Sequence, residues 1–310
     1  MSVLAGLRAG ALDQLVYVLV CLGAGIAAQR AGVLTERWTD RLNHLAFYAA
    51  LPALVFVSVY GQSLGALVSP ALVGGLWVAL FGTAFVAWYV HRDYASATRR
   101  GVATMQSYHT SVGVLGLPLV AALFGARVTA VASVVLGIVA FSQLPLTAFL
   151  LARVGNAERR LRDEVVRFFG NPVLAALLAG ASASALGLPV PDPAIESLDA
   201  VSELALPAAL LCVGASLPLD ARPSDLETTG AVVGLKLGLM PILAWATFSR
   251  LSVASATLVA AVVMLAMPTA VSTFVYAGEF GGDDGFASTN VFATFVGSVG
   301  TLFVLLQFLR

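Results

Sequence analysis

Two groups of small polar residues lie beside prolines inside apolar segments, where they could bind an anion within a membrane. A proline removes one helical N–H and displaces a carbonyl one turn back, so it interrupts a helix. The N-terminal ends of interrupted helices carry free N–H groups that bind carboxylates, and hydroxyls add adaptable donors and acceptors. The candidate substrate-binding residues are Thr110, Ser111, Gly113, Gly116, Pro118, Pro268, Thr269, Ser272 and Thr273.

A second explanation of these residues stays open. Serine and threonine hydroxyls in apolar helices commonly bond back to their own helix, and glycines there ease helix packing. For any one hydroxyl this structural explanation is favoured. For the two segments as a pair, we expect a binding site.

Four further polar side chains in apolar segments are candidates for coupling transport to a charge: His109, Glu203, Lys236 and Asn43. Ionisable groups inside membrane segments are costly and are usually functional. His109 has a side chain type that titrates near neutral pH. Lys236 is the only lysine, and it could attract an anion, pair with a carboxylate or extend to the surface. Glu203 could carry a proton, and Asn43 could coordinate a substrate or join two helices.

The composition indicates an all-α membrane protein. Hydrophobic residues make up 59% of the chain and charged residues 11%, with a mean hydropathy of +0.92. Soluble domains carry roughly twice that charge. The net charge is zero, which argues against nucleic acid as a partner. We find no metal-helix, nucleophile-elbow or phosphate-loop motif, so the sequence predicts no enzyme, no metal and no cofactor.

Apolar runs of the length needed to cross a bilayer, about 20 residues, recur along the whole chain. We expect ten transmembrane helices, at residues 14–32, 37–60, 70–90, 101–124, 127–152, 168–188, 197–217, 227–248, 254–279 and 284–308.

The arginines predict how these helices are oriented. Cytoplasmic loops are enriched in basic residues. Most arginines lie in the loops after the first, third and fifth helices, including the central loop 153–167. This distribution predicts a multi-pass plasma-membrane protein with both the N-terminus and the C-terminus outside.

The two halves share landmarks in the same order. Pro52 and Pro207 each lie in an Ala-Leu-Pro-Ala run, and they are about half a chain length apart, as are Pro118 and Pro268. This predicts a five-helix repeat over residues 1–155 and a second over residues 156–310. Because five is odd, the second repeat must be inverted. Chance is the alternative, since these residues are common in membrane helices.

Several segments together resemble the auxin efflux carrier family, within the wider group that includes bile-acid sodium symporters. The matching runs are NHLAFYAALPALVF at 43–56, GVLGLPL at 113–119, Asn171-Pro172, LPAALLCVGASL at 206–217 and MPTAVSTFVYAGEFGGDDGFASTNVFAT at 267–294. The resemblance implies ten helices in an inverted five-plus-five repeat, with broken helices 4 and 9 crossing at their prolines beside the substrate. It also implies a scaffold of helices 1, 2, 6 and 7 and a transport domain of helices 3–5 and 8–10.

The resemblance further implies a small organic anion as substrate. Many family members carry asparagine where this chain has Ser111 and Ser272, which leaves the identity of the anion open. We expect a secondary transporter or facilitator that works by an elevator-type movement in the lipid bilayer, with proton or sodium coupling and a homodimer as further expectations. The alternatives are a sodium-coupled symporter of the bile-acid type and a non-transporting membrane sensor or scaffold subunit.

Overall fold

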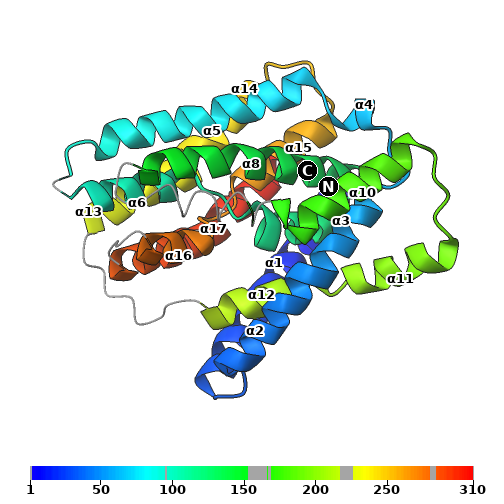
Figure 1. Cartoon of the computed structure of the whole chain (residues 1–310), viewed down its shortest axis with the longest axis horizontal. Coiled ribbons are helices and arrows are strands. Elements are labelled where there is room, and N and C mark those ends of the chain that lie inside the picture. Colours follow the sequence, from blue (N-terminus) through cyan, green and yellow to red (C-terminus); the bar gives the residue numbers. More distant parts are fainter. Residues whose placement is uncertain are drawn as a thin grey trace.

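The computed structural model describes residues 2–94, 96–152, 166, 169–216, 226–279 and 284–309. Throughout these ranges the regular structure is helical, apart from one isolated antiparallel bridge between Thr110 and Thr269 (Figure 1). Within the described ranges, six helices are long and apolar enough to cross a membrane: Glu36–Val59, Pro70–His91, Ala126–Thr147, Asp192–Ser216, Leu226–Phe248 and Gly285–Phe308. Shorter apolar helices accompany them. The prediction of an all-α membrane protein is confirmed at this level.

The helices follow the predicted segments closely. The first half contains α1 (Ser2–Arg30), α2 (Glu36–Leu45), η1 (Ala46–Ala50), α3 (Leu51–Val59), α4 (Leu64–Leu67), α5 (Pro70–His91), α6 (Ala97–Tyr108), η2 (Val112–Gly116), α7 (Leu117–Leu123) and α8 (Ala126–Ala152). Here α1 begins at Ser2 instead of residue 14.

The second half contains α10 (Pro172–Ala185), α11 (Asp192–Ser202), α12 (Ala205–Ser216), α13 (Leu226–Val233), η3 (Gly234–Leu239), α14 (Met240–Phe248), α15 (Ser255–Leu265), α16 (Ser272–Glu279) and α17 (Asp284–Phe308). The predicted helix at 197–217 is two helices, α11 and α12, and begins at Asp192. The central basic loop predicted at 153–167 lies outside the described residues except for position 166.

Three prolines inside the apolar segments follow a π-helical turn. Each of η1, η2 and η3 ends just before the helix in which the proline is the second residue: Pro52, Pro118 and Pro241. The residue before each proline donates its N–H five residues back, as Leu117 does to the carbonyl of Val112. This wider turn makes room for the pyrrolidine ring, which would otherwise clash with a carbonyl of the preceding turn. The helix therefore continues through these prolines.

The helices pack in two groups. Group A consists of α1, α2–α3, α10 and α11–α12, and group B consists of α5–α8 and α13–α17. In Figure 1, α5 runs along one edge of the molecule and packs against α6, α8 and α14, whereas α1, α2, α3 and α12 gather at another end. Within group A, the backbones of α1 and α12 come into contact, which is possible because Gly25 and Gly214 have no side chain. A side-chain carbon on Gly25 would clash with the carbonyl of Leu211, and one on Gly214 with that of Leu22.

Candidate substrate-binding site

Two interrupted helices of group B meet at a short extended crossing. The first interruption separates α6 from η2 at His109–Ser111, and the second separates α15 from α16 at residues 266–271. The extended segments pair with each other: the N–H of Ser111 donates to the carbonyl of Pro268 (3.0 Å), and the N–H of Ala270 donates to that of His109 (3.3 Å). The crossing is therefore a hydrogen-bonded unit built from segments about 160 residues apart.

The first interruption lies away from its predicted position. The sequence predicted a break at Pro118, but this proline is buried inside α7, after the π-turn that accommodates its ring. The chain is extended at His109–Ser111 instead, about two turns earlier. Pro268 does lie in the second interruption. The residues that pair across the crossing are thus Thr110 and Thr269, not the two prolines.

The paired threonines satisfy carbonyls of each other's helices. The hydroxyl of Thr110 lies within hydrogen-bond distance of two carbonyls, that of Met264 in the last turn of α15 (3.2 Å) and that of Met267 just beyond its end (3.3 Å). The hydroxyl of Thr269 donates to the carbonyl of Gln106 (2.6 Å), near the end of α6. Both side chains are almost fully buried. These hydroxyls complete helix ends that would otherwise be left with buried, unpaired acceptors.

Two long side chains donate hydrogen bonds to carbonyls at the same helix ends. Gln143 Nε2, from α8, donates to the carbonyl of Tyr108 (3.3 Å). Lys236 Nζ, from η3, donates to the carbonyl of Leu265 (2.9 Å) and contacts Met240 Sδ (3.2 Å). Both side chains are buried. With the two threonines they supply donors to the C-terminal ends of both broken helices.

A buried amide network holds the crossing against α17. Gln106 Nε2 donates to the carbonyl of Ala287 (2.9 Å) and to the hydroxyl of Thr273 (3.3 Å). Asn290 Nδ2 donates to Gln106 Oε1 (2.8 Å), and Thr229 donates to Asn290 Oδ1 (2.7 Å). Sequence reasoning missed Gln106, although an uncharged amide four residues before Thr110 in an apolar segment was a usable signal.

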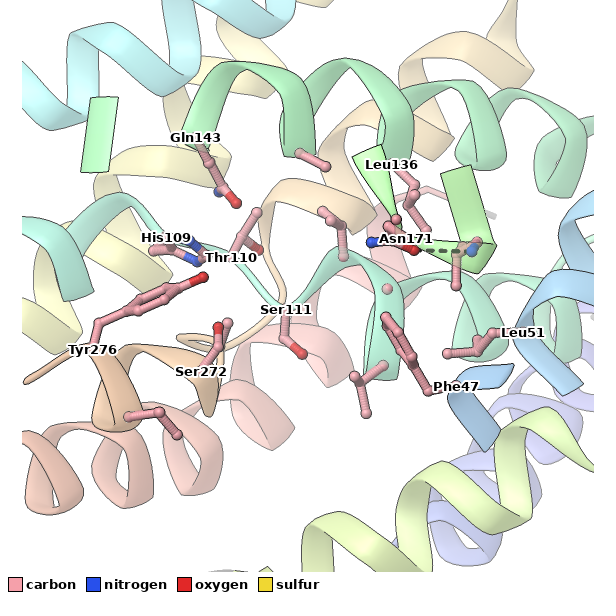
Figure 2. A pocket seen from close by; sticks show the side chains of 18 of the residues that line it. Phe47, Leu51, His109, Thr110, Ser111, Leu136, Gln143, Asn171, Ser272 and Tyr276 are labelled. Atoms are coloured by element: carbon pink, nitrogen blue, oxygen red, sulfur yellow. Dashed lines mark hydrogen bonds between the residues drawn. The ribbon is translucent and has the colours of Figure 1, made fainter. Parts of the chain in front are cut away.

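A cavity of about 540 Å³ opens on the other side of the crossing. Figure 2 shows Ser111 and Ser272 at its centre, with His109 and Tyr276 on one side and Phe47 and Leu51 on the other. The described residues that line it include no Asp or Glu; they are Phe47, Tyr48, Leu51, His109, Thr110, Ser111, Val112, Gly113, Val114, Leu136, Ala140, Gln143, Gly170, Asn171, Val173, Ala270, Ser272, Val275 and Tyr276. Both groups of helices contribute to this wall.

Two helices begin at this cavity. The helix Val112–Leu123 starts beside Ser111, and α16 starts at Ser272, so both N-terminal ends lie against the lining. Such ends carry partial positive charge and N–H groups without helical acceptors. Among the described residues, the structure records no hydrogen-bond partner for the hydroxyl of Ser111 or of Ser272. The described residues of the lining thus offer hydrogen-bond donors and carry no acidic side chain.

The candidate site residues separate into two sets. Five line the cavity: His109, Thr110, Ser111, Gly113 and Ser272. Five do not: Gly116, Pro118, Pro268, Thr269 and Thr273. Thr273 is buried in the amide network, and Gly116 lies where a side-chain carbon would be 3.0 Å from Met264 Sδ. Of this second set, Pro268 and Thr269 lie in the crossing itself, whereas Pro118 lies in α7 and lines a different cavity.

His109, Asn43 and Glu203 lie in different parts of the structure. His109 is half-buried on the cavity wall, its ring is edge-on to Tyr276 at 6.1 Å between centroids, and its Nδ1 has no partner in the described part of the chain. Asn43 is exposed and lines a shallow neighbouring pocket with Asp40. Glu203 is exposed between α11 and α12.

Glu203 lines a second cavity of about 540 Å³, which also contains Asp199, Pro118 and Pro207. It lies between α1, α3 and the α11–α12 turn on one side and α7 on the other. Within the described ranges, no three His, Cys, Asp or Glu side chains lie close enough to hold a metal ion.

The family model for membrane transport proteins matches residues 11–166 and 161–306, nearly the whole chain. The chain belongs to this family. It is the auxin efflux carrier family that the sequence resemblance indicated, so that prediction is confirmed. Membership in a family of membrane transporters agrees with the cavity between two groups of apolar helices.

Two relatives match over almost their full length. An "Uncharacterized transporter" of Methanothermobacter thermautotrophicus is 26% identical over 299 residues, which cover 94% of this chain and 96% of that protein. A "Putative malonate transporter" of Rhizobium meliloti is 25% identical over 300 residues, which cover 90% of this chain and 92% of that protein. The chain is thus similar to transporters along its whole length.

Proposed function

We propose that this membrane transport protein carries a small organic anion, a carboxylate, as a secondary active transporter or facilitator. The observation that supports this best is the cavity at the crossing, where two helix N-termini and the hydroxyls of Ser111 and Ser272 converge and where the described lining residues include no acidic side chain. A carboxylate accepts hydrogen bonds from N–H and hydroxyl donors and gains from the positive helix ends. The name of the Rhizobium relative points to the same chemical class.

The carbonyl groups at the C-terminal ends of the broken helices accept hydrogen bonds from protein side chains. Thr110, Thr269, Gln143 and Lys236 all donate to them. A cationic substrate would need acceptors, and the cavity has few: the amide oxygens of Gln143 and Asn171 and the hydroxyls. We therefore propose that the hydroxyls of Ser111 and Ser272 and the backbone N–H groups around Gly113 donate hydrogen bonds to the anion.

Group A would be the scaffold and group B the transport domain of an elevator-type movement. The cavity wall supports this division, because Phe47 and Asn171 come from group A whereas Ser111 and Ser272 come from group B. The crossing itself joins one segment from each proposed inverted repeat, residues 1–155 and 156–310. An anion held by group B would move relative to group A when the transport domain slides.

The cavity would open to the cytoplasm in this conformation. It is bordered by Asn171 at the start of α10 and by α16, which are on the predicted cytoplasmic side, whereas the second cavity around Glu203 is on the predicted outer side. We further propose a plasma-membrane location with both termini outside. His109 is the coupling candidate that lies on the cavity.

Uptake by purified protein in liposomes tests the proposal. We would measure accumulation of labelled malonate and of a panel of other mono- and dicarboxylates, with and without pH and sodium gradients, against protein-free liposomes. We expect at least one carboxylate to be taken up and to be displaced by unlabelled competitor. Absence of uptake for every acid, while a labelled organic cation is carried, would overturn the proposal.

A further inference from the structure

Lys236 is a fully buried lysine at the end of a broken helix. It lies in the π-turn η3, its side chain has no exposed surface, and its Nζ donates to the carbonyl of Leu265, the last residue of α15. The salt bridge recorded within the described residues is a surface pair, Arg92 with Asp93. In that part of the chain, Lys236 therefore has a helix end as its counter-charge and no carboxylate.

That helix end is the kind of place where a transporter binds a coupling cation. The C-terminal ends of half-helices carry partial negative charge, and together with unwound carbonyls they coordinate sodium in transporters with broken helices. A sodium ion there would need several carbonyl oxygens that are free of other donors.

Protein donors already engage these carbonyls. In the second broken helix, Met264 and Met267 accept from Thr110 and Leu265 accepts from Lys236. In the first, Gln106 accepts from Thr269 and Tyr108 from Gln143. The side chain of Lys236 is itself fully buried, and it reaches from η3 to the last residue of α15.

We propose that the Lys236 ammonium is a built-in cation that replaces a coupling sodium ion at the α15 end, so that anion transport by this chain is independent of sodium. The inference rests on the proposed anion transport. Lys236 does not line the cavity, so it is a positioning residue: it fixes the end of α15, and through Thr110 the crossing on which Ser111 lies.

Thermal unfolding of the purified full-length protein tests this without any substrate. Wild-type protein should unfold at the same temperature in sodium chloride and in choline chloride of equal ionic strength. Lys236→Ala should unfold about 4 °C or more below wild type, because the Leu265 carbonyl loses its donor. Propylammonium, which matches the deleted part of the side chain, should restore much of this loss, whereas tetramethylammonium should not.

The matched control is Arg250→Ala, which removes an exposed cation whose Nη1 donates to the carbonyl of Ala246. It should show no response to propylammonium. Sodium-specific stabilisation of wild type, or a Lys236→Ala variant that propylammonium does not rescue, would overturn the proposal. If Lys236→Ala does not fold, Lys236→Met can be tested instead, because it keeps the side-chain volume and removes the charge. An unfolding temperature of Lys236→Met equal to that of wild type would also overturn the proposal.

These outcomes separate this inference from the proposed function. Uptake of malonate or another acid that requires a sodium gradient would overturn the role of Lys236 and leave anion transport intact. Failure to carry any acid would overturn the proposed function, whereas propylammonium rescue would still establish the built-in cation.

Discussion

Thr110 and Thr269 face each other across the antiparallel bridge, and each donates its hydroxyl to a carbonyl near the end of the helix that leads to the other. This exchange leaves no hydroxyl of the pair free for a ligand. It joins the crossing into a single unit, because a carbonyl near the end of each broken helix accepts a hydrogen bond from a threonine of the other segment. Among the described residues, the hydroxyls of Ser111 and Ser272 have no recorded partner, so they remain available as donors on the cavity wall.

Removing either exchanged hydroxyl should destabilise the protein. Thr110→Val and Thr269→Val keep the side-chain shape but leave buried carbonyls without their donors, and each should cost about 1 kcal/mol in the free energy of unfolding. Thermal unfolding measures this. Thr301→Val is the control, because that hydroxyl bonds back to its own helix at Gly297. Equal losses in all three variants would contradict the special role of the crossing.

Filling the cavity should stop transport without unfolding the protein. Ser111→Leu and Ser272→Leu each place a bulky side chain at the centre of the cavity, and uptake of a transported acid should fall by roughly tenfold or more, since about 1.4 kcal/mol of lost binding already corresponds to tenfold. Ser182→Leu, at an exposed position on α10, is the matched control and should transport normally. Normal uptake in both cavity variants would remove the crossing from the proposed site.

The two glycines of the first broken helix should respond differently to alanine. A side-chain carbon on Gly116 would lie 3.0 Å from Met264 Sδ and 3.2 Å from the carbonyl oxygen of Ser111, whereas one on Gly113 would have its nearest contact at 3.9 Å. Gly116→Ala should therefore lower the free energy of unfolding by about 1–3 kcal/mol. Gly113→Ala should fold normally and impair uptake, because it narrows the cavity. The reverse order of stabilities would show that the packing at Gly116 is looser than described.

The two cavities should be reachable from opposite sides of the membrane. In a background of Cys21→Ala and Cys212→Ala, Ser272→Cys should react with a membrane-impermeant thiol reagent in inside-out vesicles. Ala121→Cys, in the second cavity, should react in right-side-out vesicles. Each variant is the control for the other. Labelling of Ser272→Cys from outside only would reverse the proposed orientation.

Much of this architecture was predictable from local sequence. The apolar runs located the helices, because the length and composition of a membrane-crossing helix are set by the bilayer. The crossing was predicted at Pro118 and Pro268, and only Pro268 lies in it. Two of the small polar residues predicted beside it, Ser111 and Ser272, do lie on the cavity. The matching runs also predicted the transporter family.

The position of the first interruption needed the tertiary structure. A proline is a local signal, but Pro118 is accommodated by the π-turn η2, as Pro52 is by η1. The chain is interrupted instead at His109–Ser111, where the backbone pairs with residues 268–270. Nothing in the local sequence reveals a partner so far along the chain.

The sequence by itself determined the residue types at the site: hydroxyls, glycines and one lysine in an apolar chain. Only the tertiary structure decided which of them are free. Thr110, Thr269 and Lys236 donate hydrogen bonds to carbonyls at the ends of the broken helices. Ser111 and Ser272 line the cavity instead. The reason is that a buried hydroxyl or ammonium must find an acceptor. Which acceptor it finds depends on how helices far apart in the chain pack together.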